Sequence, residues 1–120
     1  MLTRPQQLTE AFKVLIDQHL ADLVSNRATE MLEIEQFADL MHIHPTHLSN
    51  TIKEVTGNSA CGIYQEKIVT LAQHLLLNPD YSIRDIALLL DFEPSQFTKW
   101  FKRFNGITPK TYRERQFLKS

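Results

Sequence analysis

Glycine, cysteine and long apolar runs are scarce in this chain of 120 residues. Three glycines and five prolines are too few for the many turns of an all-β fold, which favours a helical protein. The single cysteine, Cys61, cannot form an internal disulfide, which is typical of a reducing compartment. Residues 68–77, the longest apolar stretch, are too few to span a bilayer, and residues 1–10 lack the apolar segment of a signal peptide. We therefore expect a cytoplasmic protein with no membrane partner.

A general excess of positive charge is also missing, since the formal net charge is −1. The charges are nevertheless unevenly placed, because residues 1–60 carry four basic and eight acidic residues, whereas residues 61–120 carry nine and six. From residue 94 onward there are seven cations and one acid, Glu114. This asymmetry indicates a local surface that faces an anion, although a solvated basic tail fits the charge alone equally well.

Apolar residues recur at helical spacing along nearly the whole chain, and no stretch alternates as a strand would. The pattern predicts an all-α fold of about seven helices joined by short loops. The expected helices are residues 6–25, a short helix within 33–41, then 45–55, 59–77, 83–90, 94–104 and a last helix from residue 109. Gly57 and Gly106 stand where helices end, and Ser82 with Asp85 resembles a capping box at a helix start.

Two helix pairs superpose when the chain is shifted by 49 positions. In the second helix of each pair, Leu48, Ile52, Lys53, Val55 and Gly57 fall on Phe97, Phe101, Lys102, Phe104 and Gly106. In the first helix, Ile34, Phe37, Ala38 and Met41 fall on Ile83, Ile86, Ala87 and Leu90. A short helix, a tight break and a second helix ending in glycine therefore occur twice, which is the helix-turn-helix pattern.

The second helix of each pair has a separate polar face. At about 100° per residue, Thr46, Asn50 and Lys53 point away from the apolar residues Leu48, Ile52 and Val55. In the second copy we expect Phe97, Phe101 and Phe104 in the core, Trp100 at its edge against the linker helix, and Ser95, Lys99 and Lys102 exposed. Small polar, amide and cationic side chains can hydrogen-bond base edges and phosphates.

The repeat predicts how the chain is organised. We expect an N-terminal amphipathic helix (residues 1–28), a first helix-turn-helix (29–58), a linker helix (59–78), and a second helix-turn-helix with a C-terminal helix (79–120). A linker of about 18 residues rises about 27 Å, and successive major grooves on one face of DNA lie about 34 Å apart. Helices 45–55 and 94–104 can therefore enter adjacent grooves of one duplex from a single chain.

The second half of the chain resembles the C-terminal signature of the AraC/XylS family of bacterial transcription regulators. The residues that carry the resemblance are Ile83, Ile86, Ala87, Phe92, Phe97, Phe101, Lys102, Gly106, Thr108, Pro109, Tyr112 and Arg113. The likeness covers about residues 31–115, since the first half is similar to the family's first helix-turn-helix and linker. One departure is Asp91, because the family usually has glycine at this place in the turn.

The resemblance implies two helix-turn-helix units whose second helices lie in successive major grooves. It assigns base reading to Thr46, Ser49 and Asn50 in the first unit and to Ser95, Gln96 and Lys99 in the second. It places Lys53, Lys102 and Arg103 near phosphates. The expected partners are double-stranded DNA and RNA polymerase, and the expected function is sequence-specific regulation of transcription.

Other chemistry finds little support in the sequence. His42, His44 and His47 match no closed zinc pattern, so we expect no metal or other cofactor and interpret His47 as a neighbour of a phosphate or a base. Cys61 has no accompanying nucleophile and base and is expected to be structural. No glycine-rich phosphate loop is present either, and we therefore do not expect an enzyme.

Two alternatives remain open at this point. A helical protein-interaction domain could instead dock an acidic partner through its basic C-terminal face. The N-terminal helix could pack on the first unit or mediate dimerisation, which predicts a monomer or a weak homodimer through this helix. Because members of the family commonly carry a sensor domain, the chain is either a minimal regulator or a piece of a larger protein.

Overall fold

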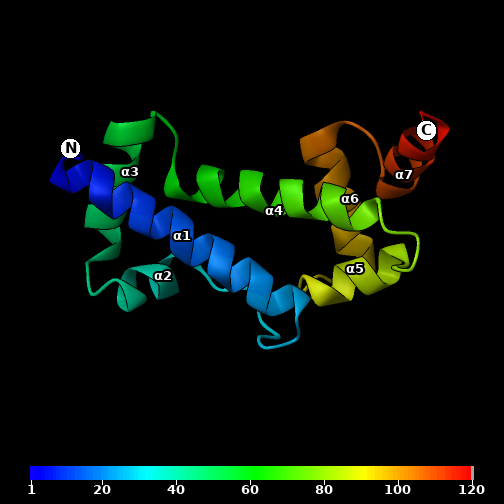
Figure 1. Cartoon of the computed structure of the whole chain (residues 1–120), viewed down its shortest axis with the longest axis horizontal. Coiled ribbons are helices and arrows are strands. Elements are labelled where there is room, and N and C mark those ends of the chain that lie inside the picture. Colours follow the sequence, from blue (N-terminus) through cyan, green and yellow to red (C-terminus); the bar gives the residue numbers. More distant parts are fainter. Residues whose placement is uncertain (120) are drawn as a thin grey trace.

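Seven α-helices make up the computed structural model, which describes residues 1–119, and this range contains no strand. The helices are α1 (Arg4–Val24), α2 (Ile34–Leu40), α3 (Pro45–Thr56), α4 (Ala60–Leu76), α5 (Ile83–Leu89), α6 (Pro94–Asn105) and α7 (Pro109–Leu118) (Figure 1). The prediction of an all-α, seven-helix fold is confirmed, and the predicted helix bounds differ from the observed ones by one or two residues.

Local hydrogen bonds fix the helix ends. Gly57 and Gly106 end α3 and α6 in the left-handed conformation, with φ of 77° and 82°, which glycine adopts without a steric penalty. Ser82 and Asp85 form the predicted capping box, in which the Ser82 Oγ accepts the Asp85 N–H at 2.9 Å and the Asp85 Oδ2 accepts the Ser82 N–H at 3.0 Å. These bonds lower the pKa of the Asp85 carboxyl.

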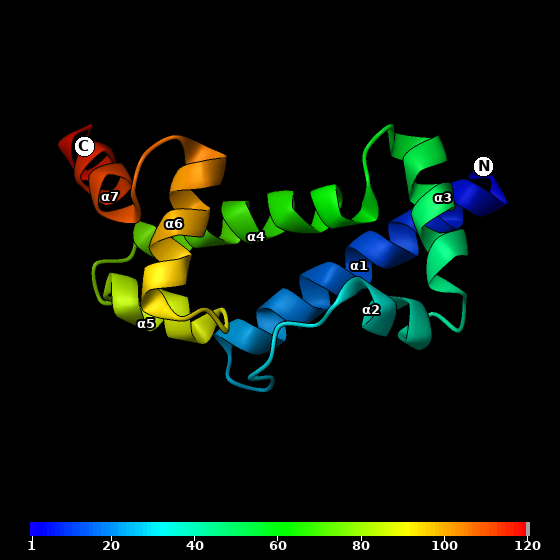
Figure 2. The same cartoon turned by 180° about the vertical axis from the view of Figure 1, so that it is seen from behind.

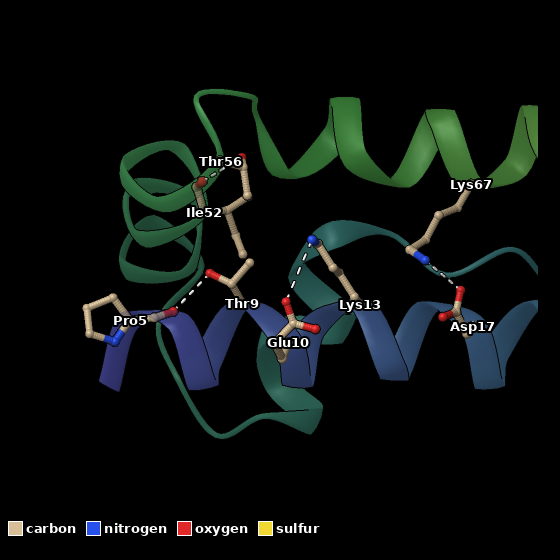
Figure 3. Close-up of polar contacts among 8 residues, drawn as sticks. All are labelled: Pro5, Thr9, Glu10, Lys13, Asp17, Ile52, Thr56 and Lys67. Carbon is tan, nitrogen blue, oxygen red and sulfur yellow. Dashed lines mark hydrogen bonds and ion pairs between the residues drawn. The ribbon is translucent and has the colours of Figure 1, made fainter. Parts of the chain in front are cut away.

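The first hydrophobic core joins α1 to α2, α3 and α4. Its fully buried side chains are Phe12, Ile16, Leu23, Phe37, Ala38, Leu48 and Ile52. The N-terminal helix therefore packs on the first helix-turn-helix unit, which is one of the two arrangements that the sequence left open. On the surface, Lys67 of α4 forms an ion pair with Asp17 of α1 at 2.8 Å (Figure 3).

The second hydrophobic core joins the C-terminal half of α4 to α5, α6 and α7. Its buried members are Ala72, Leu75, Leu76, Ile86, Ala87, Leu90, Phe97 and Phe101. The ring of Tyr112 packs edge-on against Phe101, with 5.5 Å between the ring centroids. Arg113 donates from Nε to the Leu76 carbonyl at 2.9 Å, which ties α7 to the end of α4. Two residues of the family signature, Tyr112 and Arg113, therefore stabilise the second unit.

Helix α4 connects the two cores along the long axis of the molecule, whose extents are 45 × 27 × 25 Å. Helices α3 and α6 lie at opposite ends of this axis and cross it in roughly the same direction (Figure 1). Seen from behind, α3 passes in front of α1 and α6 passes in front of the end of α4 (Figure 2). The second helices of both pairs therefore lie on the same face of the molecule.

One part of the predicted core was wrong. Phe104 is 48% exposed, and Val55, which occupies the same position in the first repeat, is 37% exposed. The reason is that α2 and α5 have seven residues each, whereas α3 and α6 have twelve, so that the last turn of the longer helix extends past its partner. Cys61, which we expected to be structural, is also exposed, in the first turn of α4.

Candidate nucleic-acid interface

The turns between the two helices of each pair have the same geometry. In the first unit the Ile43 N–H donates to the Ala38 carbonyl at 3.0 Å, and in the second the Phe92 N–H donates to the Ala87 carbonyl at 2.8 Å. The residue before each donor, His42 or Asp91, is left-handed, with φ of 57° or 64°. The 49-residue repeat of the sequence is thus a structural repeat, in which α3 and α6 leave equivalent turns.

In the first unit, α3 presents all five predicted site residues to solvent. These exposed residues are Thr46, His47, Ser49, Asn50 and Lys53. Leu48, Thr51 and Ile52 are buried on the opposite side and attach the helix to α1 and α4. The Nδ1 of His44 accepts the Thr46 N–H at 3.1 Å and caps the helix start, and the Lys53 Nζ donates to the Gly57 carbonyl at 3.1 Å. The polar face of α3 is therefore held in place by a capped helix and a buried apolar side.

In the second unit, α6 presents a more basic face. Its exposed predicted residues are Ser95, Gln96, Lys99, Lys102 and Arg103. Ser95 donates from Oγ to Glu93 Oε1 at 2.7 Å. The Arg103 guanidinium lies 5.8 Å from the centre of the exposed Phe104 ring, a cation–π contact. The structure therefore exposes all ten predicted site residues in two groups, one on α3 and one on α6.

Helix α6 is seated on α4 by an aromatic cluster and two side-chain hydrogen bonds. Trp100 packs between Phe92 and Phe97, with centroid distances of 4.9 and 5.9 Å, and donates from its indole to Gln65 Oε1 at 2.7 Å. Gln73 donates to Asn105 Oδ1 at 2.6 Å near the other end of α6. The prediction that Trp100 lies at the core edge against the linker helix is confirmed.

Gln65, Gln73 and Glu93 are interface-supporting residues that sequence reasoning missed. The two glutamines contact residues 35 and 32 positions away, a separation that leaves no local signal in the sequence. Glu93 is the N-cap of α6, is exposed and holds Ser95. Its place directly before α6 was the sequence signal that could have identified it. A carboxylate at this place can accept a hydrogen bond from the N4 amino group of cytosine.

The electrostatics of the face favour an anion. Within residues 1–119, the two ion pairs join Lys13 to Glu10 and Lys67 to Asp17, so none of the four cations of the face is neutralised by an acidic partner. Those cations are Lys53, Lys99, Lys102 and Arg103. Three of the four lie on α6, which makes the second unit the more strongly cationic one.

Residues 1–119 show neither a metal-binding cluster nor a membrane-spanning helix. No group of three or more His, Cys, Asp or Glu within residues 1–119 is placed to hold a metal ion. In the same range, no helix has the length and apolar character needed to cross a membrane. A cavity of about 760 Å³ lies between α1 and α4 and is lined by none of the ten predicted site residues.

Two helix-turn-helix units that present polar second helices on one face define a double helix-turn-helix protein. The family described as "Helix-turn-helix domain" matches residues 37–115, which extend from within α2 to within α7 and so cover most of both units. The chain belongs to the AraC/XylS family of helix-turn-helix transcription regulators. This confirms the resemblance on which the site residues were assigned.

Individual proteins show the same likeness. Over 85 residues the chain is 29% identical to the uncharacterized HTH-type transcriptional regulator YobQ of Bacillus subtilis, a match that covers 70% of the chain and 35% of YobQ. The chain thus spans about a third of the length of this relative.

Solved structures agree on the fold. The C-terminal domain of AraT, a response regulator from Geobacillus stearothermophilus, is similar with a TM-score of 0.79 and 24% identity over 94% of this chain and 88% of that one. The DNA-binding domain of the global transcriptional factor AdpA, solved in complex with a target DNA, is similar with a TM-score of 0.65 and 25% identity over 80% and 90% of the two chains.

Proposed function

We propose that this chain binds double-stranded DNA sequence-specifically and regulates transcription, with α3 and α6 in successive major grooves of one duplex. The observation that carries the proposal is the equivalent exposure of two polar helices on the same face of the molecule (Figure 2). The similar AdpA domain was solved in complex with a target DNA, which supports DNA as the ligand class. The function is binding, without catalysis.

The dimensions of the molecule fit this ligand. Helix α4 has 17 residues and rises about 26 Å, and the long axis of the chain measures 45 Å. Successive major grooves on one face of B-DNA lie about 34 Å apart, which is within that length. One chain can therefore reach both grooves without a partner subunit.

The two helices divide the work of binding. Lys102 and Arg103 contact phosphates beside α6, whereas Lys53 alone has this role beside α3, so the second unit provides most of the phosphate contacts and the affinity. On α3 the exposed Thr46, His47, Ser49 and Asn50 offer hydroxyl, imidazole and amide groups, which read base edges with less help from charge. Ser95, Gln96 and Lys99 read bases from α6, and Lys53 contacts a phosphate beside the first groove.

A competition between two ligands tests this function. Fluorescence anisotropy at about 0.15 M salt, near the physiological ionic strength, compares a labelled duplex of about two helical turns with a labelled polyglutamate of the same charge. We expect the labelled duplex to bind, and we expect unlabelled duplex but not unlabelled polyglutamate to displace it. Binding of polyglutamate without binding of the duplex would instead support a protein-interaction domain with an acidic partner.

A further inference from the structure

Asp91 occupies a backbone position that favours glycine. Its φ of 64° lies in the left-handed region, where a side chain with a Cβ is normally strained and glycine is not. His42 has the same conformation, with φ of 57°, in the equivalent turn of the first unit. The turn by itself therefore does not require an aspartate, and the contacts of the carboxylate show what it adds.

The carboxylate of Asp91 reaches the other half of the molecule. Its Oδ2 accepts the backbone N–H of Met31 at 2.8 Å, a residue 60 positions earlier in the loop between α1 and α2. A hydrogen bond from an amide to a carboxylate is charge-assisted and stronger than one between neutral groups. Within residues 1–119, the side chain of His42 makes no such bond to the second unit, so this contact is specific to one of the two turns.

The loop that Asp91 contacts is itself fixed to the first unit. The residue after Met31 is Leu32, whose N–H donates to His19 Nε2 at 3.0 Å and whose carbonyl accepts from the Tyr64 hydroxyl at 2.9 Å. Both partners are buried, His19 on α1 and Tyr64 on α4, the two helices that pack on the first unit. The hydrogen bond from Met31 to Asp91 therefore lies next to the hydrogen bonds that fix Leu32 to α1 and α4.

This contact adds a hydrogen bond to an apolar attachment between the second unit and the first core. Helix α4 is shared by both cores, and Val24 of α1 packs against the second core. Four partly buried side chains pack against both cores, namely Met31, Leu71, Phe92 and Trp100. Apolar packing of this kind is non-directional. The Asp91 hydrogen bond is directional, and it acts at the turn from which α6 emerges.

We propose that Asp91 is a latch that fixes the orientation of the second recognition helix relative to the first, and so determines which half-site spacing the protein accepts. Asp91 is a positioning residue, since it acts through Met31 and the turn. The spacing role rests on the proposed DNA-binding function, whereas the latch itself is a property of the free protein. Loss of the latch lets α6 move against α3 and lets the chain accept altered spacings.

Three variants separate the latch from its surroundings. Asp91→Gly removes the carboxylate and leaves a residue that suits the left-handed turn, so the variant is expected to fold. Asp91→Asn keeps a side-chain oxygen acceptor and is the conservative rescue. His42→Gly is the matched control, because it places glycine in the equivalent turn of the first unit. Thermal unfolding establishes that all three are folded before they are compared.

The first measurement needs no DNA. Spin labels are attached at Glu54→Cys on α3 and Lys110→Cys on α7, and Cys61→Ser removes the native cysteine. All three positions are exposed. Pulsed electron paramagnetic resonance then reports the distance between the two units. We expect the distance distribution of Asp91→Gly to become about twofold broader, in keeping with a relative motion of units that lack a fixed interface. The Asp91→Asn and His42→Gly variants should match the wild type. An unchanged distribution in Asp91→Gly overturns the latch, and equal broadening in Asp91→Asn or His42→Gly overturns the hydrogen bond as its cause.

The second measurement uses duplexes that carry the selected site with one base pair added or removed between the half-sites. On these altered duplexes the wild type should lose about tenfold in affinity, because α3 and α6 can no longer occupy both half-sites at once. The Asp91→Gly variant should lose about threefold or less. An equal loss in both overturns the role in spacing. If the wild type binds no duplex, the proposed function fails and the spacing role fails with it, while the distance distributions still decide whether the latch exists.

Discussion

The imidazole Nε2 of His19 accepts the backbone N–H of Leu32 at 3.0 Å, in the loop that connects α1 to α2. A ring nitrogen can accept only when it carries no proton, so this contact requires neutral His19, protonated at Nδ1. Burial lowers the pKa of His19, and the nearby Asp22 carboxylate opposes the shift without cancelling it. We therefore expect the docking of the loop on α1 to weaken at low pH.

We predict that the free energy of unfolding falls as the pH is lowered from 7 to 5. The unfolded chain takes up a proton at His19 near pH 6.5, whereas the folded chain does so only at a lower pH, which favours the unfolded state below pH 6.5. The contribution of this group has a limiting slope of about 1.4 kcal/mol per pH unit. Urea unfolding at pH 7, 6 and 5 measures it, and His19→Gln should show a flatter profile. If the free energy of unfolding changed equally with pH in the wild type and in His19→Gln, His19 would not be the cause of the loss.

Truncation of two aromatic residues on α6 should give very different costs. Phe101 is fully buried, so Phe101→Ala is expected to lower the free energy of unfolding by about 3–5 kcal/mol. Phe104 lies one turn further along and is 48% exposed, so Phe104→Ala should cost less than about 1 kcal/mol. Denaturant unfolding compares the two. Similar losses would mean that the last turn of α6 is packed in solution.

Lys102→Ala should weaken binding to every DNA sequence. Lys102 is exposed on α6 and is expected to contact a phosphate, so its loss should lower the slope of log affinity against log salt by about one. Lys13→Ala is the matched control. This substitution removes the same charge from α1, where Lys13 lines the cavity between α1 and α4. Anisotropy titrations at several salt concentrations measure both slopes. Equal slopes for the two variants would contradict a phosphate contact at Lys102.

The elements and their order follow from local signals, which is why the sequence predicts them. Glycine is the favoured residue for the left-handed helix end at Gly57 and Gly106, and the capping box at Ser82 involves a residue three positions away. The repeat then relates the two units, because the same apolar spacing in both copies packs in the same way. The repeat and the helical period also indicated six of the site residues, whereas Ser49, Gln96 and Arg103 were assigned by the resemblance to the family.

What the sequence did not predict depends on contacts between distant segments. A helical wheel places Phe104 with Phe101, but only the packed structure shows that the last turn of α6 extends beyond α5. The bonds of Trp100 with Gln65 and of Asp91 with Met31 join residues 35 and 60 positions apart. Asp91 was noted as a departure from the family, yet its partner had no signal in the loop.

Base reading by α3 should be visible at a single residue. Asn50 is exposed and equivalent by repeat to Lys99 on α6. An amide that pairs bidentately with adenine contributes about 1–3 kcal/mol of discrimination, so Asn50→Ala should lose that preference in one half-site and leave the other unchanged. Competition titrations with single-base variants of the site measure the change. A uniform loss in both half-sites would show that Asn50 does not read a base.

Selection of bound sequences from a random duplex pool tests the central claim most directly. Two recognition helices in successive major grooves predict two enriched segments about 10 base pairs apart, centre to centre. Asn50→Ala should alter only one segment, and Lys99→Ala only the other. A pool with no enrichment, a single enriched segment, or the same change in both variants would contradict the claim that α3 and α6 read adjacent grooves of one duplex.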